Sequence, residues 1–189
     1  MKIRYNSPVI LTFTIICSIL FFIDRGTANS LMPYLLVGTS IDWTSPLSII
    51  TLFSHVLGHS NLDHLISNMT FVLLLGPIVE EKYGSKSMFL MIVFTAVFTG
   101  LLNISLFSTG LLGASGIVFM LILLVSFTNV KSREIPVTFI LVAILFVGKE
   151  FWQSMKTDQV SQFAHIIGGF CGSVFGFIGK KKVNVNDEI

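Results

Sequence analysis

Six apolar runs divide the chain, and none of them alternates apolar and polar residues with the period of two that marks a half-buried strand. The runs cover residues 8–23, 62–79, 88–107, 116–128, 135–148 and 163–178. A helix that crosses a bilayer needs about 20 predominantly apolar residues, so several runs require flanking residues to reach that length. Because only helices and closed barrels satisfy the backbone inside lipid, the pattern predicts an all-α membrane protein, a bundle of six transmembrane helices.

The segment between the first two runs, residues 24–54, mixes polar, aromatic and apolar residues. It contains Tyr34 and Trp43, aromatic residues of the kind that gather at membrane–water interfaces. An ordered loop of this length is usually functional. We therefore expect a long first loop that is partly embedded in the membrane.

The composition supports the membrane interpretation. Of the 189 residues, 53% are hydrophobic and 12% are charged, whereas soluble domains have roughly 45–50% and about 25%. No stretch outside the runs is long enough for a separate soluble domain. Residues 1–189 are therefore predicted to form a single membrane domain, with a core of about 8–179 and a short cytoplasmic tail, 180–189.

The first run follows Lys2 and Arg4, a basic start that is also typical of a cleaved signal peptide. However, Asp24 and Arg25 stand where small residues precede a cleavage site, and the run is long for the core of a signal peptide. The sequence therefore favours a retained membrane span.

The lysines and arginines predict how the helices are oriented. With the amino terminus inside, the cytoplasmic segments contain Lys2, Arg4, Lys82, Lys86, Lys131, Arg133, Lys180, Lys181 and Lys182. The outer segments contain Arg25, Lys149 and Lys156. This positive-inside bias predicts that both termini are cytoplasmic. The second, fourth and sixth helices then start on the extracytoplasmic side.

That topology brings four polar side chains to one depth, because His64 and Asn68, Ser115, and His165 all lie near the outer ends of their helices. Each could simply join helices by hydrogen bonds. Together, however, they suggest a reactive site, since polar residues within a membrane are expensive and are usually functional.

Ser115 stands in the segment Gly113-Ala114-Ser115-Gly116, and His165 begins a stripe of glycines at helical spacing, Gly168, Gly172 and Gly176. Small residues on one face let two helices approach closely. A serine needs a base to become a nucleophile, and histidine is the usual base. The pattern therefore favours a Ser–His dyad. No carboxylate completes a triad, and Ile117 rules out the G-x-S-x-G motif of α/β-hydrolases.

His64 and Asn68 are four residues apart and so share a helix face, where both could donate hydrogen bonds to an oxyanion. His55 and His59 precede them. Several histidines raise the alternative of a zinc site, but there is no H-E-x-x-H motif and no nearby set of cysteines or carboxylates. We expect His55 and His59 to be buried and to tie the loop to the helices through hydrogen bonds.

Four motifs in order resemble the rhomboid intramembrane serine proteases. They are His55-Val-Leu-Gly-His59-Ser-Asn-Leu-Asp-His64-Leu-Ile-Ser-Asn68, Glu80-Glu-Lys-Tyr-Gly84, Gly113-Ala-Ser115-Gly116, and Ala164-His165-Ile-Ile-Gly168 with Gly172. The resemblance implies a six-helix bundle with Ser115 as nucleophile and His165 as general base. It also implies oxyanion support from His64 and Asn68, a structural Glu80 at a corner after the second helix, and a gate and cap formed by the fifth helix with residues 152–161.

The resemblance further implies cleavage of other proteins' transmembrane segments in the bilayer, with no cofactor, no metal and no nucleic acid. The expected location is the plasma membrane of a prokaryote, with the active site toward the extracytoplasmic side. Two positions depart from the family. Ile50-Thr51 replace a Trp-Arg pair, and Phe119 replaces a tyrosine, so the ring can still stack on His165 without its hydroxyl bond.

Two alternatives compete with a protease. A catalytically silent relative would bind transmembrane segments without cutting them and would be expected to lack Ser115 or His165, which this chain retains. A small transporter would be expected to carry charged residues within its spans or broken-helix repeats, and the apolar runs contain neither.

Overall fold

The computed structural model describes residues 5–128, 135–154 and 159–179. Its helices are α1 (Pro8–Gly26), α2 (Met32–Leu35), α3 (Pro46–Ser54), the 3-10 turn η1 (His55–Leu57), α4 (Leu62–Tyr83), α5 (Ser85–Leu106), α6 (Ser115–Val125), α7 (Val137–Ser154) and α8 (Gln159–Ile178). The part of the chain that the structure describes contains no strand, and an isolated antiparallel bridge joins Val37 to Leu111. The predicted all-α class is confirmed, and each apolar run forms a helix.

Among the described residues, three helices, α1, α4 and α5, are long and apolar enough to cross a membrane by length and composition. The apolar helix α6 has 11 residues and is therefore about 16 Å long, half the thickness of the hydrocarbon layer. The count of six spans stays a prediction.

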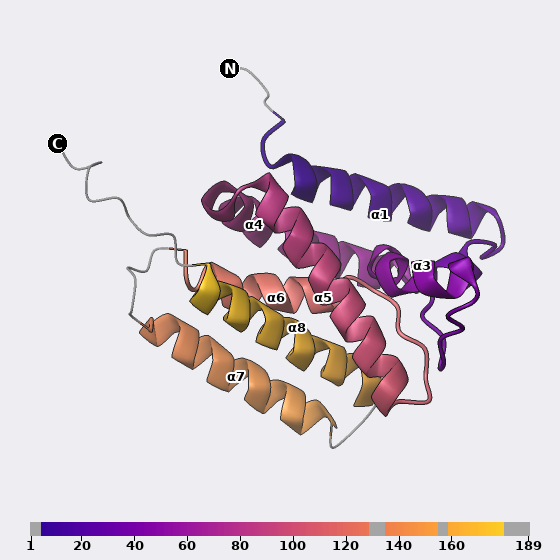
Figure 1. The fold of residues 1–189 in the computed structure, drawn as a ribbon. Coiled ribbons are helices and arrows are strands. Elements are labelled where there is room, and N and C mark those ends of the chain that lie inside the picture. The colour runs from indigo at the N-terminus through magenta and orange to yellow at the C-terminus, as the bar shows by residue number, and fades with distance from the viewer. Residues whose placement is uncertain (1–4, 129–134, 155–158, 180–189) are drawn as a thin grey trace.

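Helix α6 lies at the centre of the bundle, between α4, α5 and α8, while α1 and α7 lie on opposite outer sides (Figure 1). Its most extensive contact is with α8. Because several helices pack around α6, most of its apolar side chains are buried: Ile117, Val118, Met120, Leu121, Leu123 and Leu124. The short helix is therefore held by packing against its neighbours rather than by its own length.

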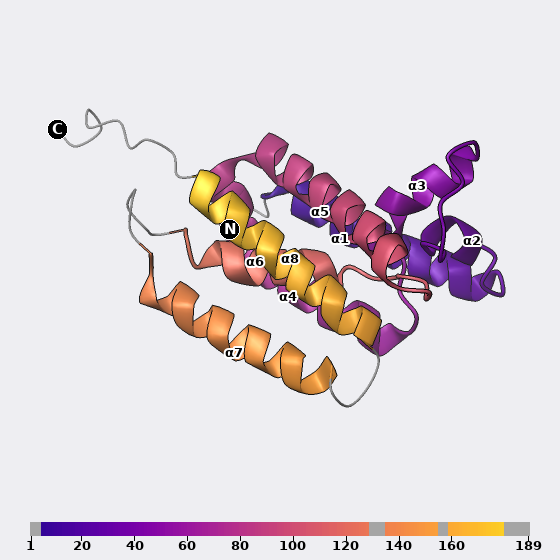
Figure 2. The same cartoon turned by 60° about the horizontal axis from the view of Figure 1, so that its bottom comes forward.

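The first loop contains more helix than its mixed composition predicts. Pro46 begins α3 at a position where a missing N–H costs nothing, and the Ser45 hydroxyl accepts a hydrogen bond from the Ser48 N–H. With α2, this helix stands out at one end of the bundle (Figure 2). The bridge between Val37 and Leu111 ties the loop to the segment that leads into α6.

The predicted position of Glu80 needs a correction, because it lies in the last turn of α4 and not after the helix. Its carboxylate accepts hydrogen bonds from the N–H groups of Val9 (3.1 Å) and Ile10 (3.0 Å) and from the Ser85 hydroxyl (2.6 Å). It therefore caps the start of α1, where backbone N–H groups have no partner within the helix. The corner itself is made by Gly84, whose φ of 82° favours glycine.

Candidate active site

The glycines Gly168 and Gly172 of α8 lie against α6. Their spacing predicted that this face of the helix makes a close contact. A Cβ atom on Gly168 would overlap the backbone of Gly116, and one on Gly172 would overlap the backbone of Met120. Both pairs are four residues apart on each helix, so α6 and α8 run in the same direction with matching turns. The absence of side chains at these positions lets the two backbones touch.

This contact brings the start of α6 and the first half of α8 together. A Cβ atom on Gly116 would lie 3.4 Å from the carbonyl oxygen of Ala164. One turn further along α6, the Phe119 ring packs against the His165 imidazole, with centroids 4.2 Å apart and ring planes tilted by 37°. Ser115 precedes Phe119 by four residues and shares its helix face. The partly buried His165 ring therefore lies over the face that carries the partly buried Ser115.

His64 lies against the loop that precedes Ser115. At Gly113, whose φ is 123°, a Cβ atom would lie 2.6 Å from His64 Cε1 and 2.8 Å from Nε2. The other ring nitrogen, Nδ1, is 3.2 Å from the Ser60 hydroxyl. When that hydroxyl donates to Nδ1, Nε2 carries the proton and its N–H is available on the side of the loop.

Asn68 lies one turn after His64 on α4 and is 6% exposed. Its side-chain nitrogen, Nδ2, is buried and has no hydrogen-bond partner within the described residues. A buried amide donor without a partner is costly unless a ligand completes its hydrogen bonds. Its donor is therefore suited to an acceptor that arrives with a substrate.

His55 ties the first loop to α5 and to the loop before Ser115, as predicted. Its Nδ1 donates to the Thr51 carbonyl at 3.2 Å, and its Nε2 lies 3.4 Å from the Thr99 hydroxyl. Its carbonyl accepts a 2.9 Å hydrogen bond from the N–H of Gly113. Burial lowers the pKa of His55 to about 4, so its ring is neutral at pH 7. Thr51 is the second residue of the Ile50-Thr51 pair that replaces Trp-Arg. Its backbone carbonyl accepts the hydrogen bond from His55.

His59 is buried as predicted, but the expected hydrogen bonds to the helices are not seen. Its ring packs edge-on against His64, with centroids 5.1 Å apart, and neither ring nitrogen has a hydrogen-bond partner in the described structure. Burial and the neighbouring His64 lower the pKa of His59 to about 4. His59 therefore contacts the site through packing.

The sequence analysis missed a polar stripe on α5. Thr95, Thr99 and Asn103 follow one another at intervals of four and are at most 3% exposed. Thr99 faces His55, and Asn103 donates from Nδ2 to the Thr109 carbonyl at 2.8 Å. The interval of four within an apolar run was a signal that could have identified them, because it places all three on one helix face.

Two other predictions concern a metal site and the cap over the active site. Among the described residues, no three His, Cys, Asp or Glu side chains are grouped so that they could hold a metal ion. The predicted cap, residues 152–161, includes 155–158, which lie outside the described residues.

The all-helical fold, its long apolar helices and the polar residues buried among them define a class of helical membrane protein. A comparison with known protein families identifies the family within this class: the model of the rhomboid domain matches residues 46–182. The chain belongs to the rhomboid family, as its motifs suggested. It is similar to the rhomboid protease GlpG of Haemophilus influenzae, with 23% identity over 131 residues, which cover 68% of each chain. Together with its apolar helices, this membership indicates an integral membrane protein.

Proposed function

We propose that this rhomboid protein is an intramembrane serine endopeptidase in which Ser115 is the nucleophile and His165 the general base. The observation that carries the proposal is the contact between Gly116 and Gly168, together with the Phe119 ring packed against His165. These contacts support the proposal because Ser115 shares the helix face of Phe119. A positioned base of this kind is what activates a serine hydroxyl.

The proposed reaction follows from these two groups. His165 takes the proton of the Ser115 hydroxyl as its oxygen attacks the scissile carbonyl, and a tetrahedral oxyanion forms. The imidazolium then gives that proton to the leaving amine, and the carbon–nitrogen bond breaks to leave an ester on Ser115. His165 then takes a proton from a water molecule, whose oxygen attacks the ester carbonyl. The imidazolium returns this proton to the Ser115 oxygen as the ester bond breaks, which releases the new carboxyl terminus and the free serine.

The oxyanion would be held by donors from two helices. The Nε2 side of His64 faces the Gly113 loop, and the Asn68 amide has a free donor. Helix α6 starts at Ser115 without a side-chain cap, so its first N–H groups and the positive end of its dipole complete the set. Donors fixed before the reaction stabilise the developing charge without reorganisation.

The proposed substrates are transmembrane segments of other proteins, cut near their extracytoplasmic ends. A peptide bond within a helix is protected by its own hydrogen bonds, so substrates should carry glycine, proline or polar residues that weaken the helix near the cut. The proposal includes six spans with both termini in the cytoplasm. In that topology α4, α6 and α8 start at the outer side.

Covalent labelling by a serine-directed fluorophosphonate tests the assignment. The wild-type protein should be labelled at Ser115, and Ser115→Ala should lose both the label and the cleavage of a transmembrane substrate. Ser126→Ala, at the other end of α6, is the matched control and should behave as wild type. His165→Ala should also lose cleavage, and combining it with Ser115→Ala should add little because the pair acts as a unit.

The same experiment separates the protease from a silent relative. A folded wild-type protein that binds a transmembrane segment, yet takes up no label and cuts no substrate, would contradict the proposal. Labelling that persists in Ser115→Ala would assign the nucleophile to another residue.

A further inference from the structure

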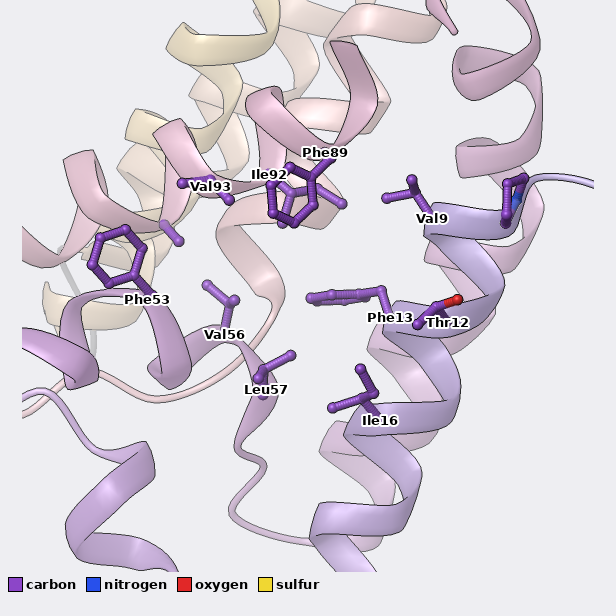
Figure 3. Close-up of a pocket in the computed structure, with 12 residues that line it drawn as sticks. Val9, Thr12, Phe13, Ile16, Phe53, Val56, Leu57, Phe89, Ile92 and Val93 are labelled. Atoms are coloured by element: carbon purple, nitrogen blue, oxygen red, sulfur yellow. The ribbon is translucent and has the colours of Figure 1, made fainter. Parts of the chain in front are cut away.

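An apolar cavity of about 420 Å³ lies between α1, the α3–η1 segment and α5. Its walls include Phe13 and Ile16 from α1, Val56 and Leu57 from η1, and Phe89 and Val93 from α5 (Figure 3). Among the described residues, no charged side chain lines it. The single hydroxyl in its wall, that of Thr12, is 3.0 Å from the Tyr5 hydroxyl. Its chemistry therefore suits a hydrocarbon.

The cavity opens at the surface of the helix bundle, between α1, α3 and α5. Ile16, Phe53 and Phe89 stand at its rim with 39%, 44% and 56% of their surface exposed. Two of its three walls, α1 and α5, are helices long and apolar enough to cross the bilayer. The opening therefore faces the hydrocarbon layer, where lipid chains are the surrounding solvent.

We propose that this cavity binds one acyl chain of a bilayer phospholipid. Its volume lies within the roughly 300–1,000 Å³ range of pockets that hold small molecules. A transmembrane helix is about 30 Å long and 10–12 Å across, several times the volume of the cavity, so a substrate helix does not fit within it. A flexible, narrow hydrocarbon chain does fit, and it fills space that would otherwise lack packing contacts.

The inner wall of the cavity is also the support of the candidate active site. Val56 and Leu57 line the cavity, and the preceding residue, His55, accepts the hydrogen bond from Gly113 two residues before Ser115. On the other side, the Cys17 thiol of α1 points to the Val56 carbonyl at 3.9 Å. A bound chain therefore packs η1 against the loop that carries the serine. The binding itself does not depend on catalysis.

Photo-crosslinking in nanodiscs tests the proposal. The discs contain phosphatidylethanolamine and phosphatidylglycerol, doped with a phosphatidylcholine that carries a diazirine in one acyl chain. Mass spectrometry should find the crosslinks concentrated on the cavity residues of α1, η1 and α5. They should exceed those on lipid-facing side chains of α4 such as Leu74, which is 63% exposed. Equal labelling at both places would overturn the proposal.

A filling variant with a matched control sharpens the test. Val93→Phe puts a ring into the cavity and should lower labelling of its walls about tenfold, which corresponds to a loss of about 1.4 kcal/mol in binding free energy. Val93 also borders a second groove toward α8, and Val97, one turn along α5, lines that groove but not the cavity. Val97→Phe therefore makes the same change in the second groove alone and should leave labelling of the cavity walls unchanged. Equal labelling in the two variants would contradict the assignment.

A second readout covers the case in which Val93→Phe folds poorly. Adding the unmodified phospholipid to detergent-purified protein should raise the unfolding temperature, because a ligand that binds the folded state stabilises it. Ala96→Leu, which fills the cavity from its buried wall, should remove this rise. Ser115→Ala should keep it, and should keep the crosslinks, so a failure of the proposed protease leaves this test intact. Crosslinking of an added transmembrane peptide to the cavity walls in place of lipid would overturn the proposal.

Discussion

Gly113 is required for two separate reasons at the residue scale. Its φ of 123° belongs to a region that side chains rarely adopt, and its Cα faces the ring of His64. The N–H of the same residue donates to His55. Gly113 therefore holds the loop before Ser115 close both to the His64 imidazole and to the η1 turn.

Gly113→Ala should therefore reduce fluorophosphonate labelling and cleavage sharply while the protein remains folded. The added methyl group would lie 2.6 Å from His64 Cε1 and must displace either the ring or the loop. The strained φ adds a cost of about 1–3 kcal/mol. Labelling rates and thermal unfolding measure the two effects. Gly26→Ala is the control, because a Cβ atom there has no neighbour within 4 Å. Equal activity of the two variants would remove Gly113 from the site.

Asn68→Ala should lower the turnover number by about 100-fold, the cost of losing one oxyanion donor, with little change in KM. The amide is buried and its Nδ2 is unpaired, so removing it breaks no hydrogen bond of that nitrogen in the described structure. Cleavage kinetics with a transmembrane substrate measure the effect, with Ser67→Ala at the neighbouring exposed position as the control. An unchanged turnover number would show that Asn68 does not contact the oxyanion.

At the scale of elements, the contact between α6 and α8 holds His165 in place. Gly172 touches the backbone of Met120, two turns beyond the candidate site. Gly172→Val should push the helices apart, destabilise the fold by about 1–3 kcal/mol and abolish cleavage. Thermal unfolding and substrate cleavage test this together. Ser173→Val, at the next position of α8, should retain activity, and a Gly172→Val protein with full activity would contradict the close packing.

The sequence predicted the long helices well, because most of each helix lies within one apolar run. The stripe of Gly168 and Gly172 likewise predicted which face of α8 makes a close contact. The first loop was harder, because α3 is stabilised by its Ser45 cap and by contacts with α5 that no local pattern reveals. The helix ends differ from the predicted ends by several residues. The second run was predicted to end at residue 79, whereas α4 continues to Tyr83 and therefore includes Glu80.

At the scale of the whole molecule, two buried histidines make stability depend on pH. Burial lowers the pKa values of His55 and His59 from 6.5 to about 4, so both are neutral in the folded protein at pH 7. The unfolded chain takes up protons as the pH falls below about 6.5, while the folded protein does so only near 4. Each histidine therefore contributes stability that is complete above pH 6.5 and declines by about 3 kcal/mol as the pH falls to 4.

Thermal unfolding of the detergent-solubilised protein between pH 7 and pH 4.5 measures this decline. His59→Phe keeps a ring against His64 but cannot titrate, so it should reduce the decline by about the 3 kcal/mol assigned to one histidine. A slope equal to that of the wild type would show that His59 is not buried in its neutral form.

The sequence predicts the site in outline, since the predicted topology puts Ser115, His64, Asn68 and His165 at one level. The supporting contacts could not. Whether Thr99 or Asn103 reaches His55, and whether His59 has a hydrogen-bond partner, depends on side-chain directions across three helices that are distant in sequence. The cavity behind η1 depends on how α1 and α5 diverge, which leaves no mark on the pattern of either helix.

The matching turns of α6 and α8 restrict how the candidate site can be turned off. With Gly116 opposite Gly168 and Met120 opposite Gly172, sliding α8 to the next register moves it by one turn. That step of four residues is about 6 Å, twice the length of a hydrogen bond. A shift of this size would take His165 out of hydrogen-bond reach of Ser115, so the proposed dyad depends on the one register that these backbone contacts set.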